Sequence, residues 1–169
     1  MARPTRPAAS TWPRPPMASG RKLIVSNRRA RFDYHLGDRF EAGLVLTGSE
    51  IKSLRAGKAS LQDAFVFVGA DGADLVNLYI GPYEHAGYAG HEPKRRRRLL
   101  LHKRELDKLR KGTERQGFTI VPTQLHLSNG RAKVEIALGK GKQQHDKRQS
   151  TAERDAKRAI DRAKKERGA

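Results

Sequence analysis

The sequence predicts a mainly β fold with short helices: a small antiparallel barrel followed by a basic C-terminal tail. Three observations support this fold class. Apolar and polar residues alternate on one side of an Asn129-Gly130 pair, as in a β-hairpin. The helical patterns are short and do not alternate regularly with strands, so a parallel sheet is not indicated. After residue 139 the pattern takes on a helical period rich in lysine, arginine and alanine.

The first segment, residues 1–20, contains five prolines and few aliphatic residues. Such a composition buries too little apolar surface to offset the entropy lost on ordering, so we expect this segment to be disordered. Met17 precedes a more ordinary stretch of sequence. Our hypothesis is that translation starts at Met17 rather than at Met1.

The clearest strands are Phe118–Ser128 and Arg131–Leu138, which flank the Asn-Gly pair. Asn-Gly suits the two positive-φ positions of a type I′ turn. In the second strand, aliphatic residues alternate with charged ones, which predicts one core face and one basic face. Pro122 predicts an edge position or a bulge in the first strand, because proline cannot donate to a strand ladder.

A second hairpin is expected from Ala64–Val68 and Leu75–Ile80, with its turn around Asp71-Gly72. Together with the first hairpin, it gives the body of the chain, residues 21–139, a mostly strand-like pattern.

Two short helices interrupt these strands. The first opens with the capping-box pattern Thr47-Gly48-Ser49-Glu50, turns Ile51 and Leu54 inward and ends at Gly57. The second runs from about His102 to Lys111, with acidic residues early, basic residues late and Gly112 after them. Many short strands with inserted helices are typical of the oligonucleotide-binding (OB-like) barrel, which we expect for residues 21–139.

Residues 140–169 form a basic hinge and tail. Alanines and Ile160 fall along one helical stripe among many lysines and arginines, so the tail can form a helix but has little to bury. Like charges at helical spacing repel, and isolated helices of this length are marginal in water. We expect the tail to be disordered when free and helical when bound to RNA on a ribosome.

Composition points to a polyanionic partner. The net charge is +18 on 169 residues, and nucleic acid best balances the resulting self-repulsion. Cysteine is absent, which excludes disulfides, thiolate zinc sites and cysteine nucleophiles, and fits a cytoplasmic location. No window approaches the ~20 apolar residues of a membrane helix, so no membrane association is expected.

Three segments are candidates for nucleic-acid contact. Asn27–Tyr34 sets three arginines beside two aromatic residues, a mixture suited to phosphates and bases, although a solvated strand with buried aromatics is an open alternative. Lys94–Arg98 is the densest basic run and is expected to be a mobile loop that adds only nonspecific affinity. Glu41 is an acidic strand residue that could select base or ribose donors, or form only a surface ion pair.

His145 and Asp146 raise the alternative of a ribonuclease, with imidazole as the general base. Adjacent side chains point to opposite sides of an extended chain, and no second histidine lies at a useful local spacing. We therefore expect no enzymatic activity. The six histidines have no ligand-like spacing, and Gly139–Lys142 lacks the spacing of a phosphate loop, so neither a metal nor another cofactor is expected.

Four motifs in order resemble the SsrA-binding protein family, also called small protein B, of bacterial trans-translation. They are NRRARFDY from Asn27, FEAGLVLTGSEIKSLRAGKASLQDAF from Phe40, the run Arg98–Leu106, and KGKQQHDKR from Lys140. The similarity covers about Asn27 to Arg148. It implies an OB-like barrel that binds the tRNA-like domain of transfer-messenger RNA (tmRNA, also called SsrA) and accompanies it to stalled ribosomes.

The resemblance also implies roles for individual residues. Positions that match the family's RNA-binding residues are Asn27, Tyr34, Glu41, Leu100, His102, Lys133, Lys140 and Lys142; we add Arg28, Arg29 and Arg31 from the charge pattern. Positions that match the ribosome-engaging hinge are Gly141, His145, Asp146, Lys147 and Arg148. His145 is expected to stack on a base of the decoding centre.

The resemblance predicts a noncatalytic adaptor, expected to be a monomer, that imitates an anticodon arm and places its tail in the empty mRNA channel. The consequence would be ribosome rescue and tagging of the nascent peptide for degradation. Elongation factor Tu and alanyl-tRNA synthetase would be reached through the RNA. The alternative is a ribosomal or ribosome-assembly protein, which would share the charge, the barrel and the tail.

Overall fold

The computed structural model describes residues 20–115 and 117–167. Within them the elements are β1 (Arg21–Ser26), α1 (Arg28–Asp33), β2 (Tyr34–Leu44), α2 (Gly48–Arg55), β3 (Ala59–Ser60), β4 (Phe65–Gly69), β5 (Gly72–Val76), β6 (Tyr79–Ile80), the 3-10 helix η1 (Gly87–Ala89), β7 (Arg97–Leu100), α3 (Lys103–Thr113), β8 (Phe118–Ser128), β9 (Arg131–Gly141) and α4 (Gln144–Arg167). Apart from Gly20, the segment expected to be disordered, including Met17, lies outside the described residues.

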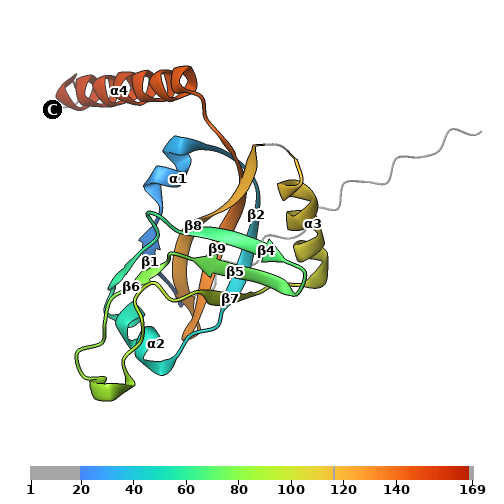
Figure 1. The fold of residues 1–169 in the computed structure, drawn as a ribbon. Coiled ribbons are helices and arrows are strands. Elements are labelled where there is room, and N and C mark those ends of the chain that lie inside the picture. The colour runs from blue at the N-terminus through green and yellow to red at the C-terminus, as the bar shows by residue number, and fades with distance from the viewer. Residues whose placement is uncertain (1–19, 116, 168–169) are drawn as a thin grey trace, which may run out of the picture.

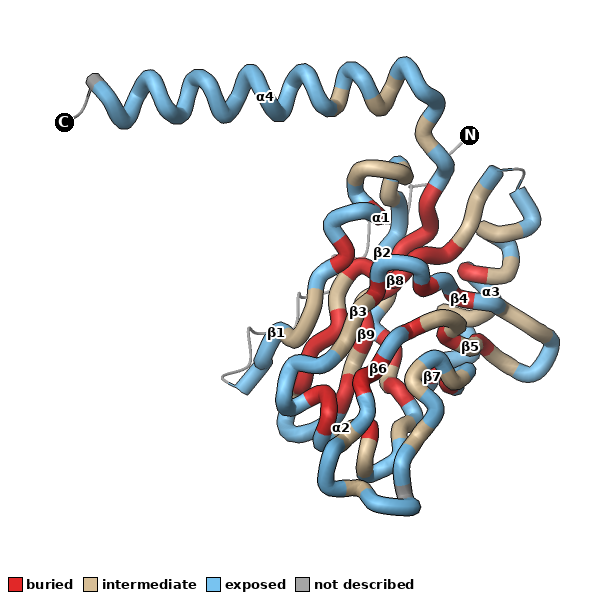
Figure 2. Tube along the Cα trace, turned by 60° about the vertical axis from the view of Figure 1, so that its left-hand side comes forward, coloured by how far each residue is buried: buried red, intermediate tan, exposed pale blue. Residues whose placement is uncertain are grey.

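Seven strands form one antiparallel sheet in the order β1-β8-β4-β5-β7-β2-β9, and β8 also pairs with β9 (Figure 1). This extra pairing closes the sheet on itself, while β3 and β6 form a separate two-stranded sheet. Buried segments of the strands face the interior (Figure 2). The core is aliphatic, and Leu75, Leu125, Val134 and Ile136 are fully buried. The mainly β antiparallel class with short helices is confirmed, whereas the OB-like topology and the predicted domain boundaries stay predictions.

The β8–β9 hairpin forms as predicted. Asn129 and Gly130 have φ values of 50° and 74°, as a type I′ turn requires. The pairing register shifts between Pro122 and Gln124, so the predicted bulge at Pro122 is confirmed. β9 continues to Gly141, which places Lys140 and Gly141 in a strand rather than in the expected hinge.

The second hairpin differs from its prediction. β4 and β5 turn at residues 70–71, and Gly72 already belongs to β5. The strand expected to run from Leu75 to Ile80 stops at Val76, because Asn77 has a φ of 60° that breaks the extended path. Tyr79–Ile80 instead pairs with β3.

The two predicted helices are present, with one corrected end. Glu50 accepts a hydrogen bond from the Thr47 backbone (2.8 Å), and the α2 turn closes at Gly57, whose φ is 78°. Gly112 does not terminate α3 but lies inside it. A Cβ at Gly112 would lie 2.5 Å from Leu138, so this glycine allows α3 to pack closely on β9.

A third helix, α1, was not predicted. Asn27 caps it: the side-chain oxygen accepts from the Ala30 backbone (3.1 Å). Within the basic segment Asn27–Tyr34, Arg28–Asp33 is therefore helical, and Tyr34 begins β2.

Only the first part of the basic run Lys94–Arg98 is a loop, because Arg97 and Arg98 belong to strand β7, and the expectation that the run adds only nonspecific affinity stays a prediction. Arg97 begins β7 and is fully buried, and its Nε donates to Glu50 Oε1 at 2.8 Å. Arg95 also donates to Glu50 (2.8 Å). The buried pair of Arg97 and Glu50 thus joins β7 to α2, because a buried guanidinium needs a carboxylate partner, and Arg95, just before β7, adds a partly exposed charge.

α4 projects away from the sheet, and most of its side chains are exposed (Figures 1 and 2). The helical capacity of the tail is confirmed, and disorder in the free state stays a prediction. Among the described residues, no helix combines the length and apolar character needed to cross a membrane.

Candidate nucleic-acid interface

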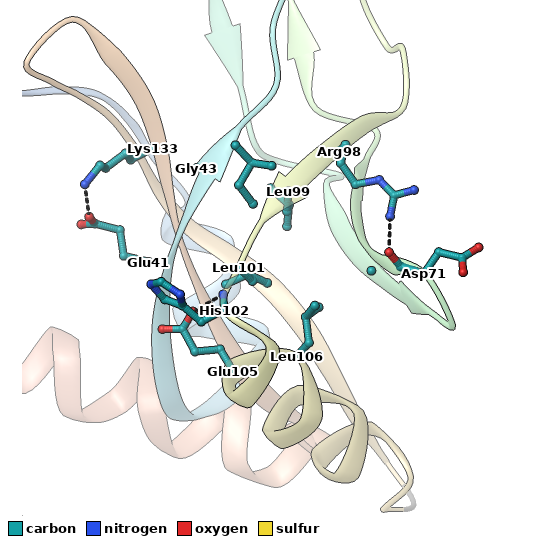
Figure 3. A pocket seen from close by; sticks show the side chains of 12 residues that line it. Glu41, Gly43, Asp71, Arg98, Leu99, Leu101, His102, Glu105, Leu106 and Lys133 are labelled. Atoms are coloured by element: carbon teal, nitrogen blue, oxygen red, sulfur yellow. Dashed lines mark hydrogen bonds and ion pairs between the residues drawn. The ribbon is translucent and has the colours of Figure 1, made fainter.

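A hollow on the outer face of the sheet brings together four of the predicted RNA-binding residues (Figure 3). We call it the Glu41 hollow. β2 supplies Glu41, β7 supplies Leu100, the start of α3 supplies His102, and β9 supplies Lys133. These residues come from three segments that are far apart in sequence, around Glu41, Leu100 with His102, and Lys133, and the segments meet only because β2 pairs with both β7 and β9.

Leu100 is an exposed apolar side chain in this hollow, 59% accessible. It faces outward because β7 alternates, with Arg97 and Leu99 buried on the opposite face. Its cross-strand partner is Gly43, where an added Cβ would lie 3.3 Å from the Leu100 Cβ. The glycine leaves Leu100 uncovered on that side, so a ligand can pack against it.

The Glu41 carboxylate has a charged or polar neighbour at each oxygen. Lys133 Nζ donates to Oε1 at 2.9 Å, and His126 Nε2 lies 3.2 Å from Oε2, off the direction of a full hydrogen bond. His126 Nδ1 lies 3.3 Å from Arg21 Nη2. Because a guanidinium can only donate, Nδ1 must accept and the ring proton sits on Nε2, facing Glu41.

The pKa values in this cluster follow from burial and charge. Burial opposes ionisation of Glu41, but the hydrogen bond and charge of Lys133 outweigh it, so the pKa of Glu41 is lowered. Burial and the positive charge of Arg21 lower the pKa of His126, against the attraction of Glu41. Glu41 therefore stays an anionic acceptor and His126 a neutral donor at neutral pH.

His102 is the residue that precedes α3, and its backbone N–H donates to Glu105 Oε2 (3.0 Å). This bond fixes the start of the helix, while the imidazole is exposed to the hollow. Arg98 lines the opposite side, where its Nη1 donates to the Asp71 carbonyl at 3.1 Å.

The predicted residues near α1 divide into buried and exposed ones. Asn27 is only 7% accessible, and its amide donates to the carbonyls of Leu61 and Pro122, both at 3.1 Å. Any effect of Asn27 on RNA is therefore expected through the position of α1. Arg28, Arg29 and Arg31 are exposed, and Arg29 pairs with Asp33 at 3.2 Å. Tyr34 is half-buried against Gly139.

Several predicted basic residues fasten α4 to α1. Lys142 Nζ donates to the Arg31 carbonyl at 3.2 Å, and its backbone N–H donates to the Asp33 carbonyl at 2.8 Å. Lys147 Nζ lies 2.9 Å from Asp33 and 5.9 Å from the centre of the Phe32 ring. The hydrogen bond from Lys147 is the main reason that the pKa of Asp33 is lowered. We call these contacts the α1–α4 joint.

The remaining hinge residues lie at the start of α4. Asp146 accepts from the Gln143 backbone (3.3 Å) and lies 2.9 Å from His145 Nε2 and 3.5 Å from His35. The His145 side chain is 72% exposed, so its ring faces solvent rather than an enclosed catalytic site. Arg148 and Lys140 are exposed as well.

His126 and Arg21 were missed by the sequence reasoning. The pairing of His126 with Lys133 could have been predicted from the sequence. A two-residue turn at Asn129-Gly130 fixes the register of the two flanking strands, and this register places His126 opposite Lys133. The contact of His126 with Glu41 could not be counted in this way, because it depends on β2 lying beside β9.

The fold and this surface define a class: a small, strongly basic, closed β protein with an apolar, hydrogen-bonding hollow suited to a folded polyanion. The family model described as SmpB protein matches residues 24–166. The chain belongs to the SmpB protein family.

Among curated relatives, the SsrA-binding protein of Acidothermus cellulolyticus is 53% identical over 145 residues, which is 86% of this chain and 91% of the relative. The SsrA-binding protein of Rhizorhabdus wittichii is 48% identical over 157 residues, or 92% and 98% of the two chains. A solved chain described as "tmRNA-SmpB: a journey to the center of the bacterial ribosome" has a TM-score of 0.61 and 45% identity. The match covers 71% of this chain and 85% of the solved one.

Proposed function

We propose that the protein is a noncatalytic RNA-binding adaptor of trans-translation. It binds the tRNA-like domain of tmRNA and delivers it to stalled ribosomes, where rescue and tagging of the nascent peptide follow. The observation that carries this proposal is the Glu41 hollow. There, three distant segments place an acceptor (Glu41), two donors (His102 and Lys133) and an apolar side chain (Leu100) on one surface. The names of the relatives and of the solved chain support the same partners.

The chemistry of the hollow suits a folded RNA better than generic polyanions. A fixed carboxylate accepts from amino groups and 2′-hydroxyls but repels phosphates, so Glu41 adds selectivity rather than affinity. Lys133 both holds that carboxylate and supplies positive charge. Leu100 offers an apolar surface to a base or ribose edge.

α4 is the part proposed to enter the empty mRNA channel. Its 24 residues span about 36 Å at 1.5 Å per residue. The α1–α4 joint couples the direction of this helix to the body, and His145 and Arg148 stay exposed for the decoding centre. Elongation factor Tu and alanyl-tRNA synthetase are proposed to act through the RNA rather than through direct contacts.

The first test compares binding to the tRNA-like domain of tmRNA with binding to ordinary transfer RNA across a salt series. We expect a preference that survives near-physiological salt, because nonspecific binding loses roughly 0.7–0.9 log units per neutralised phosphate for each log unit of salt. Glu41→Ala should erase the preference. The matched control is Glu84→Ala, which removes an exposed carboxylate paired with Lys58 at 2.8 Å and should change nothing.

Equal and steeply salt-sensitive binding of both RNAs would contradict the proposal. The ribosomal or ribosome-assembly function would then be favoured, and stoichiometric sedimentation with ribosomal subunits in high salt would support it.

A second prediction concerns His126. His126→Phe should remove the Nε2–H that faces Oε2 of Glu41 and weaken the preference for the tRNA-like domain by up to about fivefold, since this misaligned 3.2 Å contact is worth at most the ~1 kcal/mol of one hydrogen bond. Gln at this position can place an amide N–H near the site of Nε2, so His126→Gln should restore most of the preference. Equal RNA selectivity for the two variants, at similar thermal stability, would show that His126 does not position Glu41.

A further inference from the structure

The outer face of β4 carries two exposed aromatic rings, Phe65 and Phe67, which are 41% and 51% accessible. They alternate with the buried Val66, so both point away from the interior. Exposed rings in neighbouring outward positions of one strand are unusual unless something covers them, because aromatic burial is a large part of packing energy.

These rings lie between the two groups of predicted RNA-binding residues. Phe65 lines a depression with Arg29 and Tyr34 near α1. Phe67 is paired across the sheet with Asp74, and Asp74 is paired with Arg98, which lines the Glu41 hollow. Two strand spacings, roughly 10 Å, separate Phe67 from Arg98 along this row. The β4 face therefore continues the surface of the hollow.

A guanidinium is held over the Phe67 ring. The Arg96 Cζ lies 5.0 Å from the ring centre, within the range of a cation–π contact. Asp74 holds two arginines with its two oxygens: Oδ2 lies 3.0 Å from Arg96 Nε, and Oδ1 lies 3.2 Å from Arg98 Nε. Because Asp74 engages the Nε side of Arg96, the terminal amino groups of Arg96 are left for an incoming anion.

An aromatic ring beside an oriented guanidinium is the combination that takes an unpaired base together with its flanking phosphate. A protein partner for the two rings would need an apolar surface that also tolerates Arg96 and Arg98, both about half exposed. The net charge of +18 and the continuity with the hollow favour RNA over such a partner.

We propose that Phe67 and Arg96 form a second RNA subsite, in which an unpaired base stacks on the Phe67 ring and its phosphate binds Arg96 and Arg98. This inference rests on the proposed function and extends it, since it predicts that the RNA runs from the Glu41 hollow across β7 and β5 to β4. Asp74 is the positioning residue that keeps both guanidinium groups on this face.

The test compares Phe67→Leu with Phe67→Trp in the full chain. Leucine keeps apolar area but has no π face, whereas tryptophan keeps stacking. With the tRNA-like domain of tmRNA as the probe, Phe67→Leu should weaken binding about five- to a hundredfold, and Phe67→Trp should stay within about threefold of the unaltered protein. Tyr88→Leu is the control, because Tyr88 is fully exposed on η1, outside both RNA surfaces, and should bind normally.

The possible results distinguish a failure of the proposed subsite from a failure of the proposed adaptor function. If Phe67→Leu binds the RNA normally while Glu41→Ala loses the preference, the subsite is overturned and the adaptor function stands. If the unaltered protein shows no preference for the tRNA-like domain, the function itself fails. Normal RNA affinity of Phe67→Leu with reduced tagging on ribosomes would assign the ring to a protein or ribosomal contact and overturn the subsite.

Discussion

Glu50→Ala is expected to lower the free energy of unfolding by about 3–5 kcal/mol, the usual cost of removing one partner of a buried ion pair. Glu50 and Arg97 are both fully buried, and Arg95 adds a further charge on the same carboxylate. Without Glu50, the Arg97 guanidinium would lie in the interior with only carbonyl partners, such as Leu78 O at 2.6 Å.

Urea unfolding of the variant and of Glu84→Ala measures this effect, and the exposed Glu84 pair should contribute little. Replacing Glu50 and Arg97 together by apolar residues should recover part of the loss, since no uncompensated charge remains. A loss below about 1 kcal/mol for Glu50→Ala would mean that the pair does not hold α2 to β7.

The same ion pair makes stability depend on pH. Burial opposes ionisation of Glu50, but hydrogen bonds from Arg95 and the Thr47 backbone, with the charge of Arg97, lower its pKa from 4.5 to about 2. A lowered pKa in the folded state stabilises the protein above the unfolded pKa, and this stabilisation is lost as pH falls from about 4.5 through 2. The contribution is about 3 kcal/mol, and unfolding at stepped pH should show it missing in Glu50→Gln.

Truncation after Arg148 is expected to abolish tagging on stalled ribosomes while changing the affinity for the tRNA-like domain by less than about threefold. The Glu41 hollow lies in the body, and the bond of Lys147 to Asp33 precedes the cut. The deleted part of α4 is mostly exposed, and its contacts with the rest of the chain include the hydrogen bond from Lys142 Nζ to Ser150 Oγ (3.2 Å) and Arg154 over Phe32 (5.6 Å).

A substitution in the full-length chain tests whether tagging needs the helical structure of the tail or only its positive charge. Ala156→Pro removes a backbone donor in the middle of α4 at a cost of about 3 kcal/mol and should behave like the truncation in the tagging assay. Ala156→Gln keeps the helix and is the control. If truncation also removed RNA binding, the body could not be the recognition module; if Ala156→Pro supported normal tagging, charge alone would suffice.

Local sequence signals predicted the elements that depend on a few adjacent residues. The Asn129-Gly130 turn set the β8–β9 register, Pro122 marked its bulge, and Thr47 with Glu50 marked the start of α2. The same reasoning failed where a tertiary contact decided the conformation. Gly112 lies within α3 because Leu138 packs against it, and α1 forms in a segment for which no helix was predicted and a solvated strand was the open alternative.

The candidate site shows the same division. The resemblance named Glu41, Leu100, His102 and Lys133 one by one, and the closed sheet brought them into one hollow. It did not indicate that Asn27 is buried as a helix cap, or that Lys142 and Lys147 contact α1. Those contacts lie between segments that are distant in the chain, for which residue spacing carries no signal.

The sequence by itself determined the partner class and the family, because net charge and ordered motifs are properties of the chain alone. Only the tertiary structure decided which charged side chains can contact a ligand. Arg97 is buried and bonded to Glu50, whereas the Arg96 guanidinium lies over the exposed Phe67 ring. Within β7, strand alternation sends Arg97 inward and Arg98 outward, and burial then forces the inward arginine to find a carboxylate, while Arg98 stays on the outer face beside Arg96.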